Sequence, residues 1–518
     1  MDKSLDEREL CDLECLAIKA FAPLDSYMTK DQYTMCLETM KISNNDVFPI
    51  PIVCSLKSEV ELGTVLTLKN STGVIHATLV VKESWVPDLE KECVAVFGCY
   101  DTNHPYIQYM LSKGPMVYVS GDLTFQNTDF HKNFKEYRKT PEEMRRFGPW
   151  TGFQTRNPLH RSHIELIRNA SKNAIRILLH PVEGVTQECD IPFPVRMKCY
   201  KEVLPFLGDV SLSILPLSMR MAGPREAVWH AVIRRNYGCS HFIVGRDHAG
   251  PSYKKKDGTS FYDPLAAQNL AKSLEQEMGI TILTSEEVVY CENLDSYCEI
   301  SKAKGQEVKQ ISGTQFRKML DTNEEVPSWY SYPGVITALK QYYQKPKGYC
   351  FYFVGLSGSG KSTLAEGLKA FLEEQRPYQE ITLLDADVIR TNLSKGLGFS
   401  KEDRSMNVRR IGYVASEIVK HGGIVIVANI APFEEDRQFN EKLIRQYGTY
   451  VQFYVDTPLE VCESRDVKGL YKAARDGKIK QFTGISDPFE VPTTGVVVPL
   501  MPEQKALEFV CSHVVNLK

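Results

Sequence analysis

A glycine-rich segment with the sequence GLSGSGKS, at residues 355–362, constrains the fold of this 518-residue chain more than any other feature. It fits the pattern G-x-x-x-x-G-K-S/T and follows the apolar run Tyr349–Val354. Glycines let backbone N–H groups turn inward around phosphate, and a helix that follows adds the positive end of its dipole. The segment therefore predicts a strand, a phosphate-binding loop and a helix, rather than a glycine-rich turn with a chance lysine.

This loop predicts an ATP site with defined roles for two side chains. We expect Lys361 to reach the β- and γ-phosphates and Ser362 to bind the Mg²⁺ that accompanies ATP. The residues predicted to hold the nucleotide are Gly355, Ser357, Gly358, Ser359, Gly360, Lys361, Ser362 and Thr363.

Two carboxylates, Asp385 and Asp387, follow the next apolar run, Ile381–Leu384. A kinase needs one group for the metal and another near the acceptor hydroxyl, although an ordinary helix cap would use the same residues. Basic residues that could clamp a second anionic substrate follow at Arg390, Arg404, Arg409 and Arg410. Further strands are predicted at Ile424–Ala428 and Val451–Val455.

Length and pattern together predict an α/β chain of three domains, since one core rarely serves more than about 250–300 residues. Residues 1–140 carry short β-branched runs, at Thr64–Leu68, His76–Val81 and Val117–Val119, which favour a mostly β domain. Residues 141–345 alternate helical stretches such as Arg225–Tyr237 with strands such as His241–Val244. That alternation predicts a largely parallel sheet with ligands at the carboxyl ends of its strands. The phosphate-loop domain occupies residues 346–518.

A second candidate site lies in the segment QTRNPLHRSH, residues 154–163, which opens a helix over Ile164–Ala170. His160 and His163 are three residues apart, so they share one helix face near its N-terminus. Imidazoles, N–H groups and the helix dipole there suit ATP phosphates and the charge of departing pyrophosphate, while Arg156 and Asn157 can bind an oxyanion. A surface histidine pair is the plain alternative, and a zinc site would lack a third ligand.

Three further segments are glycine-bearing, basic and placed at element ends, where parallel sheets bind ligands. They are MRMAGPREA at 219–227, VGRDHAGP at 244–251 and ISGTQFR at 311–317. Together with residues 154–163 they resemble the ATP sulfurylase family over roughly residues 1–340. The resemblance implies a PUA-like N-terminal domain and a Rossmann-like nucleotidyltransferase domain.

The same resemblance implies roles for individual residues. Thr155, Arg156 and Asn157 would form the catalytic turn, and sulfate would lie against Gln154, Arg156 and Ala249. His160, His163 and Arg246 would contact the ATP phosphates, with Asp247 and His248 in the same binding loop and Val288 near the adenine.

Residues 349–518 resemble the adenylylsulfate (APS) kinase family through GLSGSGKST, LLDADVIR, GLGFSKEDR, NVRRIGYVA, VDTPLEVCESRDVKGLYKAAR and IKQFTGISDPFEVP. The resemblance implies Asp387 as the base on the substrate 3′-hydroxyl, and we expect the neighbouring carboxylate, Asp385, to be a second Mg²⁺ ligand. Residues implied to hold APS are Asp387, Arg390, Phe399, Arg404, Asn407, Ile430, Lys468 and Phe482. The chain departs from the family at Ala386, where glycine is usual, and at Ala431, where a serine hydroxyl is common.

These features predict a bifunctional enzyme of sulfate activation. The first site would make APS and pyrophosphate from ATP and sulfate, and the second would phosphorylate APS to PAPS with ATP and Mg²⁺. One alternative makes the C-terminal domain a regulatory APS- or PAPS-binding module, similar to the arrangement in filamentous fungi. Others are a sulfurylase running toward ATP, or a different nucleotidyltransferase such as a pantetheine-phosphate type.

Composition argues against several other classes of protein. A net charge of −3 lacks the basic excess of a nucleic-acid binder, and no apolar run approaches the roughly 20 residues of a membrane span. The N-terminus, MDKSLDEREL, is acidic and polar, unlike a signal peptide, and the 14 cysteines are scattered as reduced thiols would be. We therefore expect a cytoplasmic homo-oligomer without zinc, nucleic-acid or membrane partners.

Overall fold

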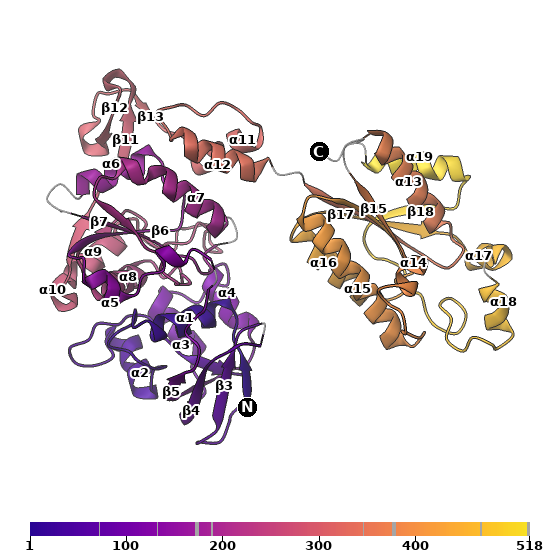
Figure 1. Ribbon diagram of the computed structural model, residues 1–518, viewed down its shortest axis with the longest axis horizontal. Helices are drawn as coiled ribbons and strands as arrows, with labels where there is room; N and C mark the ends of the chain where they lie inside the picture. The colour runs from indigo at the N-terminus through magenta and orange to yellow at the C-terminus, as the bar shows by residue number, and fades with distance from the viewer. Residues whose placement is uncertain are drawn as a thin grey trace. The chain divides into compact units, whose positions relative to one another are not determined.

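The computed structural model describes residues 1–514 except 72, 132, 171–175, 188–189, 345–346, 376–379 and 467–468, and the side chains of residues 374 and 387 are also outside the description. The chain divides into two compact units, Met1–Gln344 and Lys345–Lys518, each with its own hydrophobic cores (Figure 1). None of the described helices combines the length and apolar character that crossing a bilayer requires.

The first unit begins with a five-stranded sheet of order β1-β3-β4-β5-β2. Its strands are β1 (Asp2–Ser4), β2 (Cys54–Leu56), β3 (Val65–Lys69), β4 (Ile75–Trp85) and β5 (Val117–Phe125). The three runs predicted as strands overlap β3, β4 and β5. Four helices were not predicted, namely α1 (Glu7–Ala17), α2 (Lys30–Thr39), α3 (Leu89–Phe97) and α4 (Pro105–Ser112).

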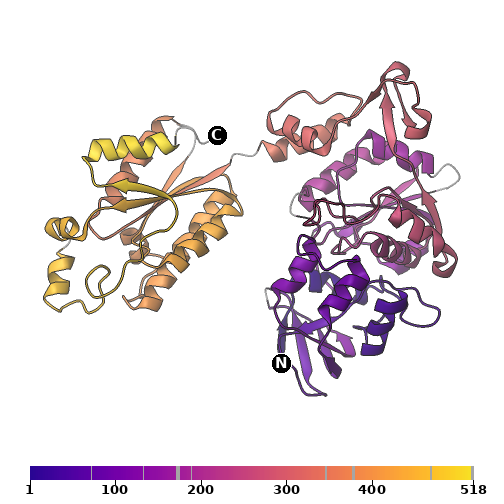
Figure 2. The same cartoon turned by 180° about the vertical axis from the view of Figure 1, so that it is seen from behind.

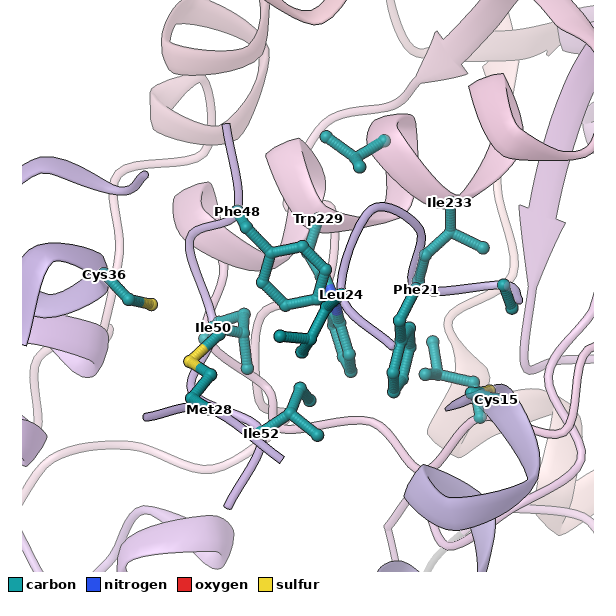
Figure 3. Packing of buried hydrophobic residues seen from close by; sticks show 14 of the residues in the cluster. Cys15, Phe21, Leu24, Met28, Cys36, Phe48, Ile50, Ile52, Trp229 and Ile233 are labelled. Atoms are coloured by element: carbon teal, nitrogen blue, oxygen red, sulfur yellow. The ribbon is translucent and has the colours of Figure 1, made fainter. Parts of the chain in front are cut away.

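A shared core joins this sheet region to the part of the unit that follows. Figure 3 shows Phe21, Leu24 and Phe48 packed around Trp229 and Ile233 of α8 (Pro224–Asn236). The rings of Phe21 and Trp229 lie 5.3 Å apart, and both side chains are fully buried. Burial of this apolar area fixes α8 and the sheet beside it on the N-terminal segment.

The second sheet of this unit is entirely parallel, in the order β10-β9-β6-β7-β8. Its strands are β6 (Trp150–Thr155), β7 (Ile177–Pro181), β8 (Val210–Leu212), β9 (Cys239–Val244) and β10 (Thr281–Thr284). Other elements here are α5 (Pro141–Arg145), α6 (Arg161–Ala170), α7 (Phe193–Val203), α9 (Ala266–Ser273) and α10 (Glu275–Met278). β7 and β8 lie on one side of β6, and β9 and β10 lie on the other. The strand order therefore reverses beside β6, and open α/β sheets bind ligands at such a switch point.

A small three-stranded sheet and two helices complete the unit (Figure 2). They are β11 (Val288–Cys291), β12 (Ser296–Glu299), β13 (Val308–Lys309), α11 (Gly313–Asp321) and α12 (Pro333–Tyr343). β11 contacts α6, and α12 packs on α7. This arrangement brings the segment around Arg317 towards the N-terminus of α6.

The second unit is a parallel sheet of order β15-β16-β14-β17-β18, with helices on both faces (Figure 1). The strands are β14 (Gly348–Val354), β15 (Ile381–Asp385), β16 (Ile424–Ala428), β17 (Gly448–Asp456) and β18 (Val496–Pro499). α13 (Lys361–Gln375) and α19 (Glu503–Val514) cover one face, while α15 (Lys401–Lys420) and α16 (Glu434–Arg445) cover the other. Short helices are α14 (Ala386–Thr391), α17 (Leu459–Arg465) and α18 (Leu470–Arg475). Every residue of β14 is buried, as expected for a central strand of a parallel sheet.

Candidate functional sites

The loop between β14 and α13 has a backbone that only glycine adopts without strain at several positions. Gly355, Gly358 and Gly360 have φ of 149°, 72° and 102°. A Cβ at Gly355 would lie 2.8 Å from the carbonyl oxygen of Val455 on β17. The predicted glycines are therefore required by the loop itself, which opens α13 as a phosphate-binding loop must.

Two polar contacts organise the start of α13. Lys361 Nζ donates to the carbonyl oxygen of Leu356 at 2.6 Å and to Ser359 Oγ at 3.4 Å. Ser362 Oγ donates to Asp385 Oδ2 at the end of β15, at 2.7 Å. A hydroxyl beside a carboxylate offers the oxygen ligands that Mg²⁺ takes together with nucleotide phosphates. Within the described residues, no group of three or more His, Cys, Asp or Glu side chains forms a metal site.

A cavity of about 610 Å³ opens above this loop. Six of the predicted nucleotide-loop residues line it, namely Ser357, Gly358, Gly360, Lys361, Ser362 and Thr363, whereas Gly355 and Ser359 do not. Six of the predicted APS residues also line it, namely Arg390, Phe399, Arg404, Asn407, Ile430 and Phe482. Lys468 and the Asp387 side chain lie outside the described residues.

The arginine residues that line the cavity include one that is bonded to the segment after α18. Arg404 donates to Thr483 Oγ1 at 2.8 Å and forms an ion pair with Asp487. The Arg390 guanidinium lies 4.6 Å above the exposed Phe399 ring and donates to the Gly398 carbonyl oxygen at 3.2 Å. Two guanidinium groups and an open aromatic ring thus border one space, which suits a planar base carrying anionic groups.

Tyr471 is a cavity residue that the sequence analysis did not single out. Its ring lies 5.0 Å from that of Phe482, and its hydroxyl donates to the Ser357 carbonyl oxygen at 2.9 Å. It therefore links α18 and the Phe482 segment to the phosphate loop. The matched stretch GLYKAAR contains Tyr471, but nothing in its spacing marks the tyrosine.

The first unit has its own site at the end of β6. Thr155 Oγ1 donates to the Asn157 carbonyl oxygen at 2.9 Å and accepts from the Asn157 N–H at 3.1 Å, which closes a tight turn. Arg156 Nη1 donates to both carboxylate oxygens of Asp190, each at 2.5 Å. Asp190 was missed because it lies 34 residues away with no pattern linking it to the turn.

The two predicted histidines meet at the start of α6. His163 Nδ1 accepts from the His160 N–H at 3.1 Å, so the proton of neutral His163 is on Nε2. His160 Nδ1 lies 2.8 Å from Ser331 Oγ, and its ring packs against Phe316 and Tyr330. Burial, followed by the neighbouring His163, lowers the pKa of His160 to about 3, and burial lowers the pKa of His163 to about 4. Both rings are therefore neutral at pH 7.

A cavity of about 270 Å³ joins these groups to α11. It is lined by Arg156, Asn157, His160, His163 and Asp190, together with Gly313, Phe316 and Arg317 of the third glycine-bearing segment. Two guanidinium groups and two neutral imidazoles thus surround one space. Such a site can orient an anion and donate hydrogen bonds to phosphate oxygens.

Of the loop after β9, Ser252 lines that cavity, whereas the predicted residues Arg246, Asp247, His248 and Ala249 do not. The Arg246 guanidinium is exposed and lies 3.6 Å from both Asp247 and Glu287, the residue before Val288. Asp247 and Ala249 have φ of 52° and 56°, so the backbone is held in a sparsely populated conformation. His248 turns inward, its Nε2 3.0 Å from His230 Nδ1 in α8. Val288, on β11, is also absent from the cavity lining, and Gln154 Nε2 contacts Met219 Sδ at 3.5 Å.

The fold and these sites define an ATP-dependent transferase: one unit pairs a parallel sheet with an anion site at its switch point, and the other carries a phosphate loop beside a second anion site. Family comparisons agree. The ATP-sulfurylase model matches residues 135–342, the adenylylsulphate kinase model residues 347–498, and the PUA-like domain model residues 2–128.

The chain belongs to the sulfate adenylyltransferase family. It is 39% identical over 507 residues to a sulfate adenylyltransferase of Chaetomium globosum, covering 94% of this chain and 88% of the relative. It is 38% identical over 534 residues to that of Gibberella zeae, covering 99% and 93%. A solved hexameric APS kinase from Thiobacillus denitrificans superposes with a TM-score of 0.74 at 26% identity, covering 100% of this chain and 94% of that one.

These matches confirm both family resemblances and the predicted fold classes, including the PUA-like N-terminal domain. The protein is a transferase with sulfurylase and APS kinase domains, and it acts in sulfate activation.

Proposed function

We propose that the chain carries out two consecutive reactions. Residues 141–345, with the PUA-like residues 1–140, form APS and pyrophosphate from ATP and sulfate, and residues 346–518 then phosphorylate APS to PAPS. The observation that carries the proposal is the second cavity, where Lys361, Ser362 and Asp385 share one space with Arg390 and Arg404. The first group suits ATP phosphates, and the second suits another anionic nucleotide.

At the sulfurylase site, a sulfate oxygen attacks the α-phosphorus of ATP. A bond forms between them as the bond from the α-phosphorus to the bridging oxygen breaks, and pyrophosphate leaves. Sulfate is already ionised at pH 7, so no strong base is needed, and positive charge and orientation dominate. Arg156 supplies that charge once sulfate competes with Asp190 for its guanidinium, while Gln154 and Asn157 help to hold the ion.

The neutral histidines serve the leaving group. His160 and His163 stand at the N-terminus of α6, where the helix dipole also favours negative charge. Neutral imidazole N–H groups donate to phosphate oxygens without a proton being lost to pyrophosphate. Arg246 would approach the phosphates from the loop after β9 when ATP is bound, and Val288 would lie near the adenine.

At the kinase site, the 3′-oxygen of APS attacks the γ-phosphorus of ATP and ADP leaves. Asp387 would accept the proton of the 3′-hydroxyl group. Lys361 would exchange its contacts with Leu356 and Ser359 for phosphate oxygens, stabilising the charge that develops on them. Ser362 and Asp385 would hold the Mg²⁺ of MgATP, which neutralises phosphate charge when bound.

Coupling the two reactions has a thermodynamic reason. APS formation is unfavourable, and a kinase that consumes APS draws the first equilibrium forward. We further propose that the protein is a cytoplasmic homo-oligomer that needs Mg²⁺ with ATP and no zinc, nucleic acid or membrane. The solved relative described as hexameric supports the oligomer.

The second candidate function makes the kinase unit regulatory. The relatives above are named only for the sulfurylase reaction, and Ala386 and Ala431 depart from the kinase pattern. We favour catalysis because a purely regulatory unit has no need of Lys361 and of the Ser362–Asp385 contact.

The test supplies APS and MgATP to the full chain and follows PAPS. Pyrophosphatase is added so that the sulfurylase cannot consume APS in reverse. The proposal expects PAPS from the wild-type protein and none from Lys361→Ala. If the wild-type chain gives no PAPS above the Lys361→Ala background, while APS or PAPS alters its sulfurylase rate, the regulatory function replaces the proposed one.

A further inference from the structure

Three polar atoms in residues that line the kinase cavity have no hydrogen-bond partner within the described part of the chain: Arg404 Nε, Asn407 Oδ1 and Asn429 Nδ2. Their residues are only 8%, 3% and 4% exposed. An unpaired buried donor or acceptor is costly, so such atoms rarely persist without a partner. Three of them around one cavity indicate that a ligand completes their hydrogen bonding.

Asn429 is the member of this group that neither the sequence nor the family resemblance assigned. Ala428, the last residue of β16, pairs with Phe353 of β14 on one side and with Asp385 of β15 on the other. The Asn429 N–H donates to the Phe353 carbonyl oxygen at 3.0 Å. This register holds Asn429 between the phosphate loop, which follows β14, and the carboxylate that contacts Ser362.

A purely structural role is served elsewhere by a similar residue. Asn440 is also fully buried, but its Nδ2 donates to the Val408 carbonyl oxygen at 2.9 Å and to the Tyr352 hydroxyl at 3.3 Å, and it does not line the cavity. Asn429 Nδ2 also lies near the Tyr352 hydroxyl, but it forms no hydrogen bond of normal geometry within the described residues, and Asn429, unlike Asn440, lines the cavity. Support of the fold therefore leaves this donor without a well-formed hydrogen bond.

We propose that Asn429 is a substrate-binding residue of the kinase site, whose amide N–H donates to an anionic oxygen of the acceptor nucleotide. The chemistry of the three atoms is complementary to an adenylyl anhydride. Asn429 Nδ2 and Arg404 Nε are donors and can bind phosphate or sulfate oxygens. Asn407 Oδ1 is an acceptor and can bind a hydroxyl or amino group. The proposal rests on the proposed kinase function for the identity of the ligand.

The experiment measures APS binding by titration calorimetry in the full chain, with MgADP present so that no turnover occurs. Every protein carries Arg156→Ala, which weakens APS binding at the sulfurylase site. Asn429→Leu keeps the size of the side chain and removes the donor, so it is expected to weaken APS binding by about 10- to 100-fold, as loss of a hydrogen bond to a charged group does. Its melting temperature without ligand is expected to stay or rise, since a buried unpaired amide has gone.

Two comparisons sharpen the result. Ser394 of the same unit has a buried hydroxyl with no hydrogen-bond partner in the described residues, but it does not line the cavity. Ser394→Ala should therefore leave APS affinity unchanged. AMP lacks the sulfate, so if Asn429→Leu weakens APS but not AMP, the amide meets the sulfate. If the substitution weakens both, the amide meets the phosphate.

Equal APS affinity in the Asn429→Leu protein and its parent overturns the proposal while leaving the kinase function standing. Should Asn429→Leu fail to fold, Asn429→Asp takes its place. It keeps the shape but turns a negative oxygen toward the ligand, and an unchanged affinity would again refute the role. If the parent protein binds no APS in the presence of MgADP, the proposed kinase function fails and this proposal with it.

Discussion

The Arg156 guanidinium donates hydrogen bonds from one nitrogen to both carboxylate oxygens of Asp190, at 2.5 Å each. The pair stands on the wall of the first cavity, with both side chains mostly shielded from solvent. The cation expected to orient sulfate is thus held in place by an anion before any substrate arrives. Sulfate must compete with Asp190, and the neutral histidines add no further charge.

Replacing Arg156 by alanine should therefore disable the sulfurylase. Loss of one such charge-stabilising group typically lowers the rate by about 10²–10³-fold, and the same loss in APS synthesis is expected here. Kinase activity on supplied APS should survive, which serves as the folding control. Near-normal APS synthesis by Arg156→Ala would refute the role of this turn.

The two histidines predict a pH dependence of stability. Their pKa values in the folded protein, about 3 for His160 and about 4 for His163, lie below the value of about 6.5 in an unfolded chain. The unfolded state therefore binds protons more readily, so the free energy of unfolding falls as the pH drops from about 6.5 toward 4. Above about pH 6.5 these residues add no pH dependence.

His163→Asn should flatten that acid loss of stability, measured as melting temperature between pH 7 and 4.5, and should also slow APS synthesis. His160→Asn should behave similarly but lower the melting temperature at pH 7 as well, because the His160 ring is packed between Phe316 and Tyr330. A His163→Asn protein with unchanged APS synthesis and an unchanged pH profile would contradict the assignment.

The contact between Ser362 and Asp385 predicts the metal dependence of the kinase. Ser362→Ala removes the hydroxyl ligand, and PAPS formation should fall at least about tenfold, because the cation supplies several kcal/mol of charge stabilisation. Raising Mg²⁺ should restore part of the rate. Ser362→Thr retains a hydroxyl and is the matched control, with activity expected near that of the wild type. Equal loss in both variants would mean that packing, rather than the hydroxyl, is what matters.

Much of the second unit was predictable from local sequence. Tyr349–Val354, Ile381–Leu384 and Ile424–Ala428 are short continuous apolar runs, which is how strands buried on both faces of a parallel sheet appear. The phosphate loop was predictable because its glycines and its lysine all serve to bind the phosphates of one nucleotide. Helix α1 was not predicted, although Asp6 and Glu9 form a capping box at its start, because the strand-like runs at 64–68, 76–81 and 117–119 favoured a mostly β domain.

The partners that complete the sites were not predictable in the same way. Asp190 reaches Arg156 and Ser331 reaches His160 only because the chain folds back over 34 and 171 residues. The direction of the His248 ring was equally hidden. The loop after β9 takes positive φ at Asp247 and Ala249, which turns the histidine toward His230 instead of the cavity. Sequence spacing places a residue at a strand end but does not fix where its side chain points.

The measurement that tests the central claim most directly starts from labelled sulfate. The full chain is incubated with MgATP, labelled sulfate and pyrophosphatase, and APS is separated from PAPS. The account predicts label in PAPS for the wild-type chain, label only in APS for Lys361→Ala, and little label in either nucleotide for Arg156→Ala. Label that stops at APS in the wild-type chain would contradict it.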